Sequence, residues 1–325
     1  MTTLDEAPVV TDGQPAPRSH GSRFRRQLPR RRAPRPVRPA RPVGPPNRVE
    51  TAGSVISTST TMVALVTLWM ALQMLVLGGV AQERSQTLLY QEFRAQVAAA
   101  TAPVGPVTEP GAPVALLEIP RLGMQQVVVE GTASGDLLAG PGHLRNTVLP
   151  GQAGTSVVLG RAATYGSPFA DVDRLEPGDR IEVTVGQGRV VFTVQGLRRS
   201  GDALPQPLAS GRSRLTLVTA EGQGRLSAIA PGETLYVDAE ASSAFPAPAG
   251  LPPTVPESEK PMGLDTGVLP LLALDLALLL ALTLGVIAAR QRWSLVHVWV
   301  VATPLALALA WVTTDGVMRL LPNLT

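Results

Sequence analysis

Arg214-Leu-Thr-Leu-Val-Thr-Ala220 decides the fold, because it reads as one short strand in a series of similar strands. Leucine and β-branched residues fill it, as is usual in a sheet. In the segment 190–197, apolar Val190, Phe192 and Val194 occupy every second position, as expected for a wall with one face on a core. The predicted strands span residues 114–119, 126–130, 155–160, 180–185, 190–197, 214–219 and 234–239. Strands this short, separated by turn sequences at regular spacing, predict a closed barrel or a sandwich.

The first 50 residues differ in composition from the rest of the chain. They are rich in arginine and proline and contain almost no aliphatic clusters. Such a segment cannot bury enough apolar surface to offset its chain entropy, so we predict that residues 1–50 are disordered. Nine arginines between Arg23 and Arg41 end shortly before a long apolar stretch. We therefore interpret this run as a cytoplasmic topology signal that contacts anionic lipid, and we expect no nucleic-acid partner.

Three apolar stretches, residues 55–80, 268–289 and 295–314, are long enough to cross a membrane. About 20 apolar residues span a hydrocarbon core of roughly 30 Å. The basic turn Arg290-Gln-Arg-Trp293 separates the last two stretches, and the positive-inside rule places this turn on the same cytoplasmic side as the arginine-rich tail. The sequence therefore predicts a multi-pass cell-membrane protein in contact with lipids, with a cytoplasmic N-terminus and residues 84–262 outside. A buried helical hairpin is the alternative for the last two stretches.

The outer region divides into a helix, a linker, a domain and a second linker. Residues 82–101 carry apolar side chains at helical spacing, and we interpret them as a stalk that continues the first span. A Pro/Gly-rich linker at 102–113 leads to the strand-rich domain at 114–240, and a Pro-rich linker at 241–263 leads back to the membrane. Because the chain has no cysteine, the stability of this domain must come from its own core.

Short motifs follow one another in a specific order along the strand-rich domain. They are Leu117-Glu-Ile-Pro-Arg-Leu-Gly123, Gly140-Pro-Gly-His143, Ser156-Val-Val-Leu-Gly160 with Thr164-Tyr-Gly166, Phe169-Ala-Asp-Val-Asp-Arg-Leu-Glu-Pro-Gly-Asp179, and the strand that ends at Ala220. In order and spacing they resemble the sortases, cysteine transpeptidases that attach proteins to the wall of Gram-positive bacteria, and in particular the class E and F type of actinobacteria. The resemblance implies a mainly β fold, with a sortase-like closed β-barrel outside the membrane joined to three transmembrane α-helices.

The resemblance also implies a catalytic cysteine, histidine and arginine, and each matching position holds a different residue. Arg161 stands at the histidine position, Ala220 at the cysteine position and Thr234 at the arginine position. A transpeptidase of this kind attacks through a thiolate, which an alanine methyl group cannot replace. Arginine stays protonated at working pH and is a poor general base. We therefore predict a pseudoenzyme without catalytic residues.

An enzyme with a hydroxyl nucleophile is the alternative interpretation. Thr219 adjoins the cysteine position and Ser227 follows in the next loop, but a hydroxyl nucleophile needs a base within hydrogen-bond reach. Among the histidines, His143 lies in the domain, and we expect it to have a structural role in a turn. The sequence contains no histidine cluster and no phosphate-binding glycine loop, so we predict neither a metal nor a cofactor.

A barrel that lacks the catalytic residues can still retain a groove that binds an extended peptide. We predict a groove lined by Arg161, Thr164, Tyr165, Thr219, Ala220 and Thr234. Arg161 would pair there with a peptide carboxylate; alternatively it is a surface charge and the domain is a spacer. The predicted function is a scaffold or regulator of wall-protein anchoring that binds a peptide or a surface protein. The alternatives are an active transpeptidase or hydrolase with serine or threonine, and a subunit of a membrane complex.

Two polar residues interrupt the predicted spans at similar depth. They are Gln73 in the first span and Asp275 in the second. Ionisable residues are costly within a bilayer and usually have a partner. We predict a hydrogen bond between these two helices, with a working proton or ligand site as the alternative.

Overall fold

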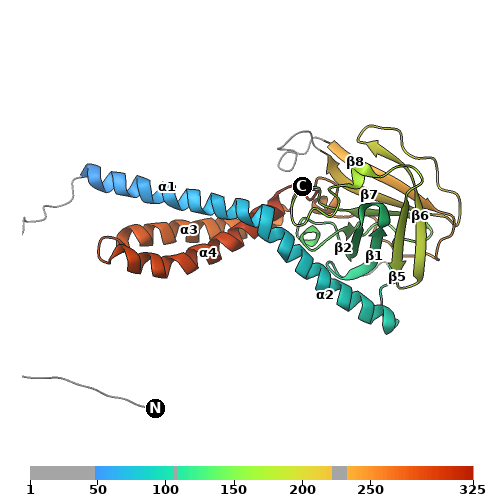
Figure 1. Cartoon of the computed structure of the whole chain (residues 1–325), viewed down its shortest axis with the longest axis horizontal. Coiled ribbons are helices and arrows are strands. Elements are labelled where there is room, and N and C mark those ends of the chain that lie inside the picture. The colour runs from blue at the N-terminus through green and yellow to red at the C-terminus, as the bar shows by residue number, and fades with distance from the viewer. Residues whose placement is uncertain (1–47, 106–107, 222–232, 325) are drawn as a thin grey trace, which may run out of the picture. The chain divides into compact units, whose positions relative to one another are not determined.

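The computed structural model describes residues 48–105, 108–221 and 233–324 (Figure 1). Ser227 and residues 1–47 of the predicted disordered tail therefore lie outside the described residues. Residues 48–50 of that predicted tail begin the first helix.

Eight strands form a closed barrel, which confirms the predicted fold class. Their order around the barrel is β1-β2-β3-β4-β7-β8-β6-β5, and the pairs β2–β3 and β4–β7 are parallel. The strands are β1 (Pro113–Ile119), β2 (Met124–Glu130), β3 (Gly142–His143), β4 (Gly154–Leu159), β5 (Arg180–Val185), β6 (Gly188–Arg199), β7 (Ser213–Glu221) and β8 (Glu233–Ala241). Seven of them overlap predicted segments. The two-residue β3 was not predicted, because so short a strand has no alternation to detect.

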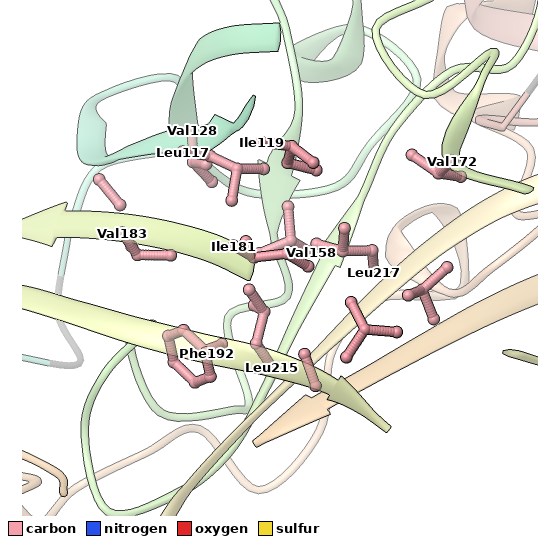
Figure 2. Packing of buried hydrophobic residues seen from close by; sticks show 14 of the residues in the cluster. Leu117, Ile119, Val128, Val158, Val172, Ile181, Val183, Phe192, Leu215 and Leu217 are labelled. Atoms are coloured by element: carbon pink, nitrogen blue, oxygen red, sulfur yellow. The ribbon is translucent and has the colours of Figure 1, made fainter. Parts of the chain in front are cut away.

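The two faces of strands such as β4 and β7 contribute side chains to two different buried clusters. In β6, Val190, Phe192 and Val194 are buried while the residues between them are exposed. Figure 2 shows Phe192, Leu215 and Leu217 among the apolar side chains that fill the barrel. Successive side chains of a strand point to opposite faces, so Val218 and Ala220 lie on the outer face of β7. These two residues belong to a second buried cluster, outside the barrel core.

A long helix leads from the first apolar segment to the barrel. It consists of α1 (Arg48–Leu72), a π-helical turn (Gln73–Leu77) and α2 (Gly78–Ala98). Gln86 of α2 donates hydrogen bonds to the carbonyl oxygens of Val127 (3.0 Å) and Ala139 (2.9 Å) and accepts one from the Val127 backbone N–H (2.6 Å). The helix predicted as a stalk is thus fastened along the barrel beside β1 and β2 (Figure 1).

Within the residues that the structure describes, three helices are long and apolar enough to cross a membrane. The segments are Val55–Leu72 in α1, Thr266–Ala289, which includes α3 (Leu269–Ala289), and Val296–Leu320 in α4 (Leu295–Leu320). All three helices contact one another, and Trp69 of α1 meets Trp311 of α4 with 6.0 Å between ring centroids. The helix α4 continues past residue 314, where the sequence predicted the span to end, and returns the chain to the barrel.

The segment between β8 and α3 packs against the barrel, although its composition predicted a linker. Phe245 lies against the barrel core, and its backbone N–H donates to the carbonyl oxygen of Gly151 at 2.8 Å. Glu259 is buried and forms an ion pair with Arg145. Proline removes backbone donors without preventing side chains from packing, so a proline-rich composition did not reveal these contacts.

Candidate functional site

Strands β7 and β8 place two of the candidate catalytic positions side by side. Ala220 and Thr234 are directly opposite each other in the antiparallel pair, and both are buried. Ala220 lies in an apolar cluster with Leu159 and Val218 on the outer face of the barrel. The position at which the family resemblance requires a thiolate is therefore a methyl group in an apolar setting.

Arg161 follows β4 and is fully buried. Its guanidinium donates hydrogen bonds to the backbone carbonyl of Ser134 (3.0 Å), to Ser134 Oγ (2.7 Å) and to Thr164 Oγ1 (3.0 Å). Ser134 Oγ in turn donates to the carbonyl oxygen of Met318 in α4, at 2.9 Å. Arg161 thus joins the loop after β2 to its own loop and, through Ser134, to the last turn of α4. We call Arg161, Ser134 and Thr164 the arginine bracket.

Neither interpretation of Arg161 drawn from the sequence matches this position. A surface charge would be exposed, whereas Arg161 has 0% relative exposure. A groove residue that pairs with a peptide would point to solvent, whereas this guanidinium is buried and hydrogen-bonded to Ser134 and Thr164. Burial lowers the pKa of Arg161 to about 10, so the side chain remains a cation near neutral pH and cannot act as a base there.

Thr164 and Tyr165 belong with Arg161 rather than with Ala220. The Tyr165 ring centroid lies 5.8 Å from the Arg161 guanidinium, a distance that permits a cation–π contact. The same ring packs against the beginning of α2, because a Cβ placed on Gly78 would lie 3.2 Å from it. Tyr165 therefore faces the junction of helix and barrel.

The Thr219 hydroxyl and the His143 ring, the two candidate groups for a hydroxyl-based chemistry, already make hydrogen bonds to other parts of the barrel. Thr219 alternates with Ala220, so it faces away from the apolar cluster, and its hydroxyl donates to the carbonyl oxygen of Gly160 at 2.9 Å. A carbonyl oxygen cannot serve as a general base. His143 is buried with Nδ1 2.9 Å from a Glu130 carboxylate oxygen and Nε2 2.9 Å from the Val148 carbonyl oxygen. These contacts give His143 a structural role in the turn.

The outer face of β4 and β7 is covered by the segment that follows α4, a contact not predicted from the sequence. Leu324 is fully buried in the cluster that contains Ala220. The Leu324 carbonyl oxygen accepts a hydrogen bond from the Ala162 backbone N–H at 3.0 Å. The Asn323 side-chain amide donates to the carbonyl oxygens of Thr132 (2.8 Å) and Lys260 (2.9 Å). We call residues 321–324 the docked segment.

A second arginine near the site was also not predicted. Arg198 of β6 lies over the Tyr236 ring, 4.1 Å from its centroid, and donates to Asp238 at 2.7 Å. Asp238 also accepts a hydrogen bond of 2.6 Å from the Thr216 hydroxyl. Arg198 was missed because the resemblance directed attention to the last strand, whereas this side chain reaches β8 from the neighbouring strand.

The described contacts do not join Gln73 to Asp275. Both side chains are buried, but Gln73 accepts its hydrogen bond from the Trp69 indole N–H at 3.0 Å, within the same helix. Within the described residues, Asp275 Oδ2 has no hydrogen-bond partner. The hydrogen bond between Gln73 and Asp275 therefore stays a prediction.

Comparison with known proteins shows what the barrel domain is similar to. Residues 117–231 match the model of the sortase domain family. Over 86 residues the chain is 30% identical to Sortase D of Bacillus subtilis (strain 168), a match that covers 26% of this chain and 42% of that protein. Sortase E from Streptomyces avermitilis is 32% identical, with a TM-score of 0.35, over 43% of this chain and 93% of that structure. The Clostridium perfringens sortase D5 transpeptidase is 20% identical, with a TM-score of 0.40, over 49% and 98%.

Proposed function

We propose that this chain, whose residues 117–231 match the sortase domain family, is a membrane-anchored sortase-like protein that has lost catalysis and binds partners at the cell surface. The observation that carries the proposal is the state of the three candidate catalytic positions. Ala220 offers no nucleophile, Arg161 is a buried structural cation, and Thr234 is a neutral side chain. Sortases attack peptides through a cysteine, and this chain has none.

The orientation is part of the proposal. The arginine-rich residues before α1 and the turn Arg290-Gln-Arg-Trp293 between α3 and α4 carry the positive charge expected on the cytoplasmic side. Three crossings then place the barrel outside. This arrangement brings the outer face of β4, β7 and β8 to the side of the membrane where wall proteins are anchored.

The binding partner follows from the class of ligand that sortases take. A solved structure holds Clostridium perfringens sortase C with the C-terminal cell wall sorting motif. We propose that the outer face around Ala220 binds such a peptide, or the surface protein that bears it, without forming a covalent bond. Apolar Val218 and Ala220 would receive apolar side chains of the peptide.

The test is a titration of the full chain in detergent with a panel of fluorescent sorting-motif peptides. We expect reversible binding, and we expect the peptide to be recovered intact. Ala220→Trp should abolish the binding, because the indole fills the apolar site. The matched variant Val191→Trp, on an exposed position of β6, should bind as the natural chain does. Equal affinity for all three proteins would overturn the proposed location, and absence of binding even at millimolar peptide would overturn the scaffold role.

A further inference from the structure

The docked segment is bound to the barrel in the way that a short peptide ligand would be. Leu321 ends α4 with an extended backbone (φ −76°, ψ 154°), and Pro322 follows, which prevents the helix from continuing. The chain then runs over the barrel as Leu-Pro-Asn-Leu. Figure 1 shows the red end of α4 leading to the barrel.

The last two residues of the docked segment contact different parts of the chain around the barrel. The Asn323 backbone N–H donates to the Gly263 carbonyl oxygen at 3.1 Å, and its side-chain amide reaches Thr132 and Lys260. Leu324 accepts from the Ala162 backbone N–H, a short distance along the chain beyond β4. Main-chain hydrogen bonds together with a buried side chain are the usual features of extended-peptide recognition.

The position of Leu324 shows what the docked segment covers. Leu324 shares one buried cluster with Leu159 and Val218 and with Ala220, whose own relative exposure is 7%. Leu159 and Val218 are opposite each other in the parallel β4–β7 pair, so Leu324 lies against the joint outer face of these two strands. This is the face that we propose as the peptide site, and here its apolar part is occupied from within the chain.

We propose that the docked segment is a resident ligand of the groove, and that an external peptide binds only after displacing it. This inference rests on the proposed function for the identity of the site, and it adds how access is regulated. The contacts define the class of competing ligand as a short extended peptide with a leucine for the apolar cluster and a side-chain amide directly before that leucine.

The absence of cysteine from the sequence provides a direct test. Ala220→Cys places a single thiol under Leu324, and its rate of modification by a membrane-impermeant thiol reagent reports how often the groove opens. In the full chain in detergent, adding Leu324→Asp should raise the rate roughly tenfold or more, because a thiol reacts from the exposed state. Adding Leu204→Asp, the same change at a leucine that is 79% exposed, should leave the rate unchanged. Ser200→Cys controls for reagent access, since this position is exposed.

A second variant tests the same inference without introducing a carboxylate into the apolar cluster. Asn323→Ala removes two side-chain hydrogen bonds without adding a charge. In the Ala220→Cys background it should also accelerate modification of the introduced thiol, while the circular dichroism spectrum of the folded chain stays that of the parent. The synthetic peptide Leu-Pro-Asn-Leu should then slow the reaction again, whereas the scrambled peptide Pro-Leu-Leu-Asn should not.

Two outcomes would overturn the inference. One is equal modification rates with and without the substitutions in the docked segment, and the other is acceleration that the peptide fails to reverse. A different result would refute the proposed function alone: the introduced thiol becomes accessible and is protected by Leu-Pro-Asn-Leu, but the chain binds no sorting-motif peptide.

Discussion

Replacement of Arg161 by methionine tests whether this residue is a structural cation. Methionine retains much of the apolar stem but removes the donors to the Ser134 carbonyl, Ser134 Oγ and Thr164 Oγ1. A buried acceptor that loses its donor costs about 1–3 kcal/mol. The Ser134 and Thr164 hydroxyls can rotate, and removal of a buried cation recovers part of its desolvation cost. We therefore expect a net destabilisation of about 2–4 kcal/mol.

The assay is thermal unfolding of the full chain in one detergent, followed by circular dichroism of the barrel. For a domain of this size, 1 kcal/mol corresponds to roughly 2–4 °C, so the expected fall in Tm is about 4–16 °C. The matched control is Arg174→Met, because Arg174 is exposed and its contact to Asp171 is a surface pair with an N–O distance of 3.4 Å. That control should change stability by no more than about 0.5 kcal/mol. If the two variants lose the same stability, the arginine bracket is not a stabilising element and the reasoning is wrong.

Four further results are expected. Phe192→Ala should cost about 3–5 kcal/mol in chemical denaturation because it leaves a cavity in the barrel core, and a loss under about 1 kcal/mol would contradict the assigned core. Burial, with a contribution from Glu259, raises the pKa of Asp136 from 3.8 to about 6. The Asp136 carboxyl therefore contributes to the free energy of unfolding below pH 3.8, and this contribution is lost as pH rises through about 6. Asp136→Asn should remove that part of the pH dependence, whereas an unchanged slope of Tm against pH between about 4 and 6 would speak against the shift. Cysteine at Ser200 should react with an impermeant maleimide on intact wall-less cells and cysteine at Ser22 should not; labelling of Ser22→Cys alone would reverse the proposed orientation. If Gln73 and Asp275 do not touch, the stability losses of Gln73→Leu and Asp275→Leu should be additive, and a coupling above about 0.5 kcal/mol would show contact.

The barrel could be predicted from the sequence because its signals are local. Period-two alternation, as in Val190, Phe192 and Val194, fixes which face of a strand is buried, and turn sequences mark where each strand ends. Three helices long and apolar enough to cross a membrane were likewise predicted from runs of apolar residues. The closed order of the strands required the family resemblance, since pairing between distant strands has no local signature.

The surroundings of the candidate site could not be predicted, because they depend on contacts between distant segments. Ser134 and Met318 are 184 residues apart, and the Asn323 contact with Thr132 joins residues separated by 191 positions. No propensity or periodicity reports such contacts. The environment of Arg161 was misjudged for a related reason: a charged residue is usually exposed, and only the tertiary structure supplies the acceptors that allow its burial. The alternation rule did contain one overlooked signal, since neighbours Thr219 and Ala220 cannot line the same face of β7.

The proposed loss of catalysis is tested most directly by the mass of a sorting-motif peptide after prolonged incubation with the purified full chain and an amine nucleophile. The structure predicts that the peptide mass stays unchanged, with neither cleavage nor transfer to the amine, in the natural chain and in Ala220→Cys alike. In the Ala220→Cys chain, the buried cation at Arg161 still supplies no base. Turnover of the peptide by the natural sequence, abolished by Ala220→Trp but not by Val191→Trp, would contradict the account.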